Sequence, residues 1–160
     1  MYQINITKTD IGGGTPTVTT PKHVVDLFLQ EVPKGTCQEH VIAYFLNKQK
    51  KVIAKYDAGI GGHDFVVIDP VLVARAAIGA LAHSVIIVHN HPFGDPRPSR
   101  ADIDETSRLR TALHTLCIAF TDHVIVSDDA WFSFSEEVCR SLADGRIRGT
   151  GKSNVNTAQP

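Results

Sequence analysis

The chain has 160 residues, a formal net charge of −1 and a hydrophobic content of 42%. This length suits one globular domain with a substantial core, and the near-zero charge lacks the basic excess of proteins that grip a phosphate backbone. No apolar stretch reaches the roughly 18 residues of a membrane-spanning helix, and residues 1–20 lack the basic start and apolar centre of a signal peptide. We therefore predict a cytoplasmic protein without a membrane segment.

The elements predicted along the chain are those of an α/β domain, in which helices flank a single mixed β-sheet. The expected order is helix, strand, strand, short strand, helix, strand, helix, strand, strand and helix. Hydrophobic periodicity and turn residues place the helices over 21–32, over 70–82 and from 99 to about 116. The same signals place strands over 39–46, 51–55, 65–68, 84–91 and from 122 to 126, before the last strand and helix.

Two of these helices differ in their expected burial. Residues 71–82 are apolar almost all round, which predicts a largely buried helix. The helix from Ser99 is amphipathic, and its expected inward positions are Ile103, Thr106, Leu109, Leu113 and Leu116.

Composition predicts one domain over residues 21–145, between a flexible N-terminal segment (1–20) and a flexible C-terminal tail (146–160). The three cysteines are odd in number and scattered, so we expect reduced thiols rather than a disulfide framework. One basic cluster lies near the C-terminus, and we interpret it as a solvated surface rather than a nucleic-acid patch. Its members are Arg140, Arg146, Arg148 and Lys152.

A candidate metal site follows the apolar run 84–88. His89 and His91 are separated by Asn90, and because a strand has a period of two, both imidazoles project from the same face of the sheet. Pro92 ends the strand and begins a turn rich in proline. We therefore expect both histidines at the end of a buried strand, where one ion can bridge them.

The next helix begins with two further candidates, Ser99 and Asp102, whose spacing is that of a capping box. The Asp102 carboxylate can also add a hard oxygen ligand to the two imidazole nitrogens. Three protein ligands leave a fourth position open for water, which distinguishes catalytic zinc sites from structural ones. The pattern therefore predicts catalysis.

Such catalysis needs a general base that is not itself a ligand. We select Glu39, which opens the predicted strand 39–46 of the same sheet. The residues alone leave other glutamates open for this role, namely Glu31, Glu105, Glu136 and Glu137.

The combination of Glu39, His89-Asn90-His91, seven residues and then Ser99-Arg100-Ala101-Asp102 resembles the JAMM pattern of the MPN+ (JAB domain) metalloproteases. Within that superfamily, the local sequence from Val88 to Ile103 resembles the bacterial RadC-like branch. The resemblance covers most of the chain, from about Glu39 to Phe134. It implies an MPN/JAB-type fold, which is similar to that of the cytidine deaminases.

The resemblance also implies a role for each matching residue. His89, His91 and Asp102 would bind one Zn²⁺ per chain, and Glu39 would activate the zinc-bound water. Ser99 would assist the oxyanion, and His123 would lie behind the site and support it. The implied activity is that of a zinc metalloprotease or isopeptidase, acting on a peptide or protein substrate such as a ubiquitin-like tail.

Other functions remain open. A DNA-repair-associated or nucleic-acid-processing protein of the RadC family is one alternative, although the N-terminal helical region usual in that family has no counterpart in residues 1–20, which favours a domain-only paralogue. A non-catalytic binding scaffold is another. The string His-Asn-His is not a nuclease signature here, because its histidines alternate on one strand.

We expect residues 58–64 and Phe93 to select the substrate. The edge strand 51–55 leaves the oligomeric state open, because such a strand can pair with another chain.

Overall fold

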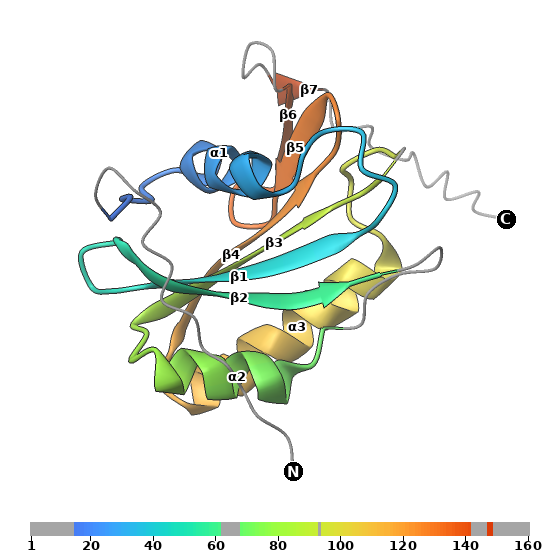
Figure 1. Cartoon of the computed structure of the whole chain (residues 1–160). Coiled ribbons are helices and arrows are strands. Elements are labelled where there is room, and N and C mark those ends of the chain that lie inside the picture. Colours follow the sequence, from blue (N-terminus) through green and yellow to red (C-terminus); the bar gives the residue numbers. More distant parts are fainter. Residues whose placement is uncertain (1–14, 62–67, 93, 142–146, 149–160) are drawn as a thin grey trace, which may run out of the picture.

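The computed structural model describes residues 15–61, 68–92, 94–141 and 147–148. A mixed β-sheet forms its centre, and three helices cover the sheet (Figure 1). The helices are α1 (Pro21–Glu31), α2 (Pro70–Gly79) and α3 (Arg100–Thr115). The strands are β1 (His40–Leu46), β2 (Val52–Ile60), β3 (Ser84–Asn90), β4 (Ala119–Val126), β5 (Ala130–Ser133), β6 (Val138–Ser141) and β7 (Ile147–Arg148).

The strand order in the sheet is β2-β1-β3-β4-β5-β6-β7. Strands β3 and β4 are parallel and are connected through α3, whereas the other neighbouring pairs are antiparallel. In the register between β1 and β3, Val41 lies opposite His89. The predicted α/β class with a single mixed sheet is therefore confirmed.

The sheet has a hydrophobic layer on each face. Helix α1 lies on one face, and α2 and α3 lie on the other (Figure 1). Strand β3 is buried along its whole length, with Ile86 and Val88 packed in the α1 layer and Val85 and Ile87 packed in the α2 and α3 layer. Side chains alternate along a strand, so the next odd-numbered residue, His89, faces α3.

The prediction of a final helix is wrong. After β5 the chain turns, with a φ of 53° at Glu137, and returns as β6. Arg140 lies opposite Trp131 in this hairpin, and its guanidinium contacts both the Trp131 ring, at 6.0 Å, and the Glu136 carboxylate. Cross-strand pairing outweighs the helix preference of the local sequence, because propensity is a weak bias that tertiary contacts override.

Burial of the helices also differs from the prediction. In α2 the residues from Val73 to Ala77 carry the buried positions, whereas Val71 and Ile78 are 62% and 52% exposed. Only one side of this helix contacts the sheet and α3. Apolar residues on its other side are therefore exposed to solvent. In α3, Asp102 and Glu105 take buried positions, while Ile103 and the residue that follows the helix, Leu116, are exposed.

The remaining boundaries follow the sequence closely. Strand β2 is longer than predicted and is reached through the expected turn after β1. Thr17 forms a bridge with Lys51, and Val18 is buried beside α1. Of the short strand predicted over 65–68 only Ile68 is described, and Phe93 also lies outside the described residues. In the predicted substrate loop 58–64, residues 58–60 belong to β2 and residues 62–64 lie outside the described residues. No helix in the described part of the chain is long and apolar enough to cross a membrane.

Candidate metal centre

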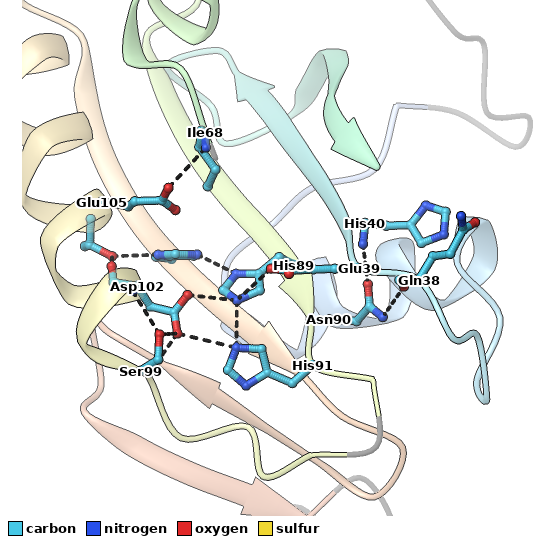
Figure 2. Close-up of polar contacts among 12 residues, drawn as sticks. Gln38, Glu39, His40, Ile68, His89, Asn90, His91, Ser99, Asp102 and Glu105 are labelled. Atoms are coloured by element: carbon cyan, nitrogen blue, oxygen red, sulfur yellow. Dashed lines mark hydrogen bonds and ion pairs between the residues drawn. The ribbon is translucent and has the colours of Figure 1, made fainter. Parts of the chain in front are cut away.

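Two imidazoles and one carboxylate converge where β3 ends beside the first turn of α3 (Figure 2). The Nε2 atoms of His89 and His91 lie 3.0 Å apart. The Asp102 carboxylate is close to both rings, with Oδ1 3.2 Å from His89 Nε2 and Oδ2 3.4 Å from His91 Nε2. The structure therefore brings together the three residues that the sequence suggested as ligands.

Ser99 fixes the orientation of the Asp102 carboxylate. The backbone N–H and the hydroxyl of Ser99 both donate to Asp102 Oδ2, at 2.7 and 2.6 Å, and the Asp102 N–H donates to Ser99 Oγ. This capping box turns Oδ1 toward His89. The single hydroxyl proton of Ser99 is used by the carboxylate here, and its assistance to an oxyanion stays a prediction.

Hydrogen bonds on the far side of each imidazole determine which nitrogen faces the centre. His91 Nδ1 lies 2.9 Å from the backbone oxygen of Asp95, and because a carbonyl only accepts, this nitrogen carries the proton. Nε2 is therefore the nitrogen of His91 that faces Asp102. His89 Nδ1 has a different partner, His123 Nε2, at 2.8 Å. The prediction that His123 lies behind the site agrees with this contact.

Thr106, which the sequence predicts only as an inward position of its helix, belongs to the site. Its hydroxyl donates to the backbone oxygen of Asp102, at 2.6 Å, and lies 2.6 Å from His123 Nδ1. The residue is 4% exposed. A hydroxyl in an otherwise aliphatic stripe, one turn after a candidate ligand, was the signal that could have identified it.

Glu39 approaches the same centre from β1. Its Oε1 lies 3.9 Å from His89 Nε2, and its side chain is 16% exposed. The register that pairs Val41 with His89 brings the residue two positions earlier level with His91 on the α3 face of the sheet. Figure 2 shows the Glu39 side chain directed toward His89.

Asn90, between the two histidines, holds the backbone on both sides of Glu39. It faces away from the metal ligands, accepts a hydrogen bond from the His40 N–H at 2.8 Å and donates to the Gln38 carbonyl at 3.0 Å (Figure 2). The strand alternation that directs the histidines to one face thus directs the asparagine to the start of β1. This contact connects the candidate ligands to the candidate base.

Three of the four other glutamates that the sequence left open have partners elsewhere, and the fourth, Glu137, is exposed in the β5–β6 turn. Glu31 pairs with Lys55, and Glu136 pairs with Arg140. Glu105 accepts a hydrogen bond from the Ile68 N–H, and burial raises its pKa above the ordinary value. Among these carboxylates, Glu39 is the one that lies within 4 Å of a candidate ligand nitrogen.

The electrostatics of the centre favour positive charge between the carboxylate and the imidazoles. Burial alone would raise the pKa of Asp102, but contacts with His89, His91 and Ser99 hold it well below its usual range. Burial alone would lower the pKa of His91, yet hydrogen bonds to Asp102 and Asp95 raise it. The pKa of the fully buried His123 is lowered well below its ordinary value by desolvation and by the neighbouring His89.

The donor set fits a divalent metal ion. The three ligand atoms lie within 4.8 Å of one another, and no other such group occurs among the residues that the structure describes. Zinc bonds of about 2.0–2.1 Å in a tetrahedral site place neighbouring ligand atoms roughly 3.3 Å apart. The observed separations of 3.0, 3.2 and 3.4 Å are close to that value. The His-His-Asp group can therefore hold a metal ion.

A mixed sheet covered by helices on both faces, with this group between a strand end and a helix start, defines an α/β domain of the JAB/MPN type. A family model described as the RadC-like JAB domain matches residues 18–139. The chain therefore belongs to the RadC-like JAB domain family, as its motifs predicted. The JAB superfamily contains metallohydrolases, which relates the chain to that broad class.

Several proteins are similar to this chain over most of its length. A UPF0758 protein of Caldanaerobacter subterraneus subsp. tengcongensis is 40% identical over 120 residues, which are 75% of this chain and 51% of that protein. A UPF0758 protein of Shouchella clausii is 37% identical over 121 residues, or 76% of this chain and 52% of that protein. One from Chlorobaculum parvum is 42% identical over 99 residues, or 62% and 45%. The chain spans about half the length of these curated relatives.

Proposed function

We propose that this chain is a zinc-dependent hydrolase that cleaves a peptide or isopeptide bond, with His89, His91 and Asp102 as metal ligands and Glu39 as the general base. The observation that carries the proposal is the convergence of three ligand atoms with a fourth, non-ligand carboxylate 3.9 Å from His89 Nε2. Family membership supports the coarser assignment to metallohydrolases.

The difference in exposure among the residues of the site supports Glu39 as the general base. The side chains of His91 and Glu39 are 21% and 16% exposed, whereas that of His89 is 2% exposed. Solvent and substrate therefore reach the centre past His91 and Glu39. A bound zinc ion supplies a Lewis acid that lowers the pKa of water and polarises a carbonyl group.

In the proposed reaction, Glu39 accepts a proton from the attacking water. The water oxygen forms a bond to the carbonyl carbon, the carbon–nitrogen bond breaks, and the protonated Glu39 gives the proton to the leaving amine. His89 and Asp102 stay fixed during this exchange because His123 and Ser99 bond their outer atoms.

The second candidate is a DNA-repair-associated or nucleic-acid-processing function, which is the alternative that membership of the RadC-like family leaves open. The net charge of −1 gives it no electrostatic support. A binding scaffold is the third, and the intact ligand set argues against it.

The test begins with metal content, measured by mass spectrometry on the purified wild type and on His89→Ala, Asp102→Ala and Glu39→Gln. We expect about one zinc per chain in the wild type and in Glu39→Gln, and none in the two ligand variants. Peptide and isopeptide-linked substrates are then screened with the wild type and Glu39→Gln.

A useful control is Glu136→Gln, because that carboxylate pairs with Arg140 rather than with the centre. Cleavage by the wild type and this control, but not by Glu39→Gln, is the expected result. A wild type that takes up no metal when zinc is supplied would contradict the proposal and favour the scaffold.

A further inference from the structure

The two contacts of the Thr106 hydroxyl group determine which atom accepts its proton. Thr106 Oγ1 lies 2.6 Å from the backbone oxygen of Asp102 and 2.6 Å from His123 Nδ1. A carbonyl oxygen only accepts hydrogen bonds, so the Thr106 proton is donated to Asp102. The remaining partner must then donate to Thr106, which places the proton of the His123 ring on Nδ1.

The protonation of His123 determines that of His89. His123 is completely buried and stacks on Phe134, with ring centroids 5.0 Å apart, and such burial disfavours the charged imidazolium. A neutral ring with its proton on Nδ1 has a lone pair on Nε2, which lies 2.8 Å from His89 Nδ1. His89 therefore donates through Nδ1, which leaves Nε2 as the nitrogen that faces Asp102, at 3.2 Å, and His91.

We infer that Thr106 and His123 are positioning residues, and that the Thr106 hydroxyl, acting through His123, selects the His89 tautomer that presents a lone pair to the metal. A neutral histidine in water prefers the opposite tautomer, with the proton on Nε2, and that proton would block the ligand position. These contacts keep a proton on Nδ1 of His89, on the side away from Asp102, whereas the consequence for metal affinity rests on the proposed zinc site.

The chain of contacts also links two ligands. Thr106 lies one helical turn after Asp102 and bonds its backbone, while His123 reaches across from β4 to His89. The helix that supplies the carboxylate ligand therefore also sets the orientation of an imidazole ligand on β3. Polar partners behind a metal ligand commonly change metal affinity by about 10–100-fold when they are removed.

The first test reads the tautomer without any metal. Nitrogen-15 spectra of the histidine rings are recorded on the full, metal-free chain at a pH about two units above the ordinary imidazole pKa of about 6.5. Signals of His89 and His123 are assigned by their loss in His89→Gln and His123→Gln. We expect Nδ1 to carry a proton in both rings. A wild-type spectrum in which Nδ1 of His89 carries no proton would overturn the inference.

The second test compares three threonine variants by competition for zinc with a chromogenic chelator. Thr106→Val removes the hydroxyl at nearly constant volume, and we expect zinc affinity to fall about 10-fold or more, with a mixed His89 tautomer. Thr106→Ser restores the hydroxyl and should return both readouts close to wild type. Thr111→Val is the matched control, because Thr111 makes the same bond to the carbonyl four residues earlier on an exposed face of α3.

These results separate the inference from the proposed function. Wild-type tautomer and affinity in Thr106→Val would overturn the inference even if zinc binds. A wild type without zinc affinity would overturn the proposed function, while its spectrum would still decide the tautomer. If Thr106→Val does not fold, the wild-type spectrum still decides the tautomer, and Thr106→Ala, which also lacks the hydroxyl, replaces Thr106→Val in the zinc competition.

Discussion

The two histidines of the candidate centre lie two residues apart, yet different parts of the molecule hold them in place. His89 is 1% exposed and is oriented by His123, which lies on β4 and is 34 residues further along the chain. His91 is half-buried at the end of β3, and the Asp95 carbonyl four residues later orients it. The buried half of the centre is thus built by tertiary contacts, and the exposed half by a local loop.

The site thus combines a rigid interior side with an accessible outer side. The interior partners fix His89 and the Asp102 carboxylate before any metal binds, which lowers the cost of assembling the ligands. The loop side leaves His91 and Glu39 partly open to solvent, where a substrate must enter. Substitutions on the two sides should therefore separate effects on stability from effects on binding.

The largest expected difference is between His89→Ala and His91→Ala. Removing the buried ring leaves a cavity and an unpaired His123 nitrogen, so the free energy of unfolding should fall by about 3 kcal/mol. Removing the more exposed ring should cost less than about 1 kcal/mol. Urea unfolding in the presence of a chelator measures both. Equal losses would show that the two halves do not differ in the way proposed.

A smaller effect is expected at Asn90, which connects β3 to the segment around Glu39. Asn90→Ala removes two part-buried hydrogen bonds to the backbone, and the free energy of unfolding should fall by about 1–3 kcal/mol. Zinc content should remain, while hydrolysis falls because Glu39 is less well placed. Asn47→Ala is the control, since the Asn47 side chain also makes two hydrogen bonds to the backbone, accepting from two N–H groups, but lies in the β1–β2 turn. A loss of activity in both variants would argue against a specific role for Asn90.

Ser99→Ala should act on both stability and metal affinity. Loss of this N-cap should lower the free energy of unfolding by about 1 kcal/mol, and Asp102 should lose the bond that orients its carboxylate. Calorimetric unfolding and zinc competition measure these effects. In Asp69→Ala, which removes the side-chain cap of α2, we expect a similar loss of stability with unchanged zinc affinity. Unchanged affinity in Ser99→Ala would remove the orienting role.

The smallest effect is expected in the loop. The Asp95 carboxylate bonds Arg97, whereas its backbone carbonyl bonds His91, so Asp95→Ala keeps the contact with the ligand but loosens the loop around it. Stability should change by less than about 0.5 kcal/mol, as for most surface substitutions. Zinc affinity should fall a few-fold relative to the exposed control Asp104→Ala, as measured by chelator competition. A loss comparable to that of Thr106→Val would erase the difference between the two halves.

The sequence alone determined the features that depend on local geometry. The alternation of a strand predicted that His89 and His91 share a face, and the spacing of Ser99 and Asp102 predicted the capping box that the structure contains. The motif also predicted the RadC-like JAB family, which the family match confirms. These predictions succeeded because neighbours within four residues fix the direction of a side chain in a strand or in the first turn of a helix.

Contacts between residues far apart in the chain could be seen only in the tertiary structure. The position of Glu39 beside His89 depends on the register that pairs Val41 with His89, and the role of Thr106 depends on the approach of His123 from β4. The final helix failed as a prediction because the pairing of β6 with β5 overrides local propensity. Each of these outcomes follows from contacts between segments far apart in the chain, whose free energy a local pattern does not contain.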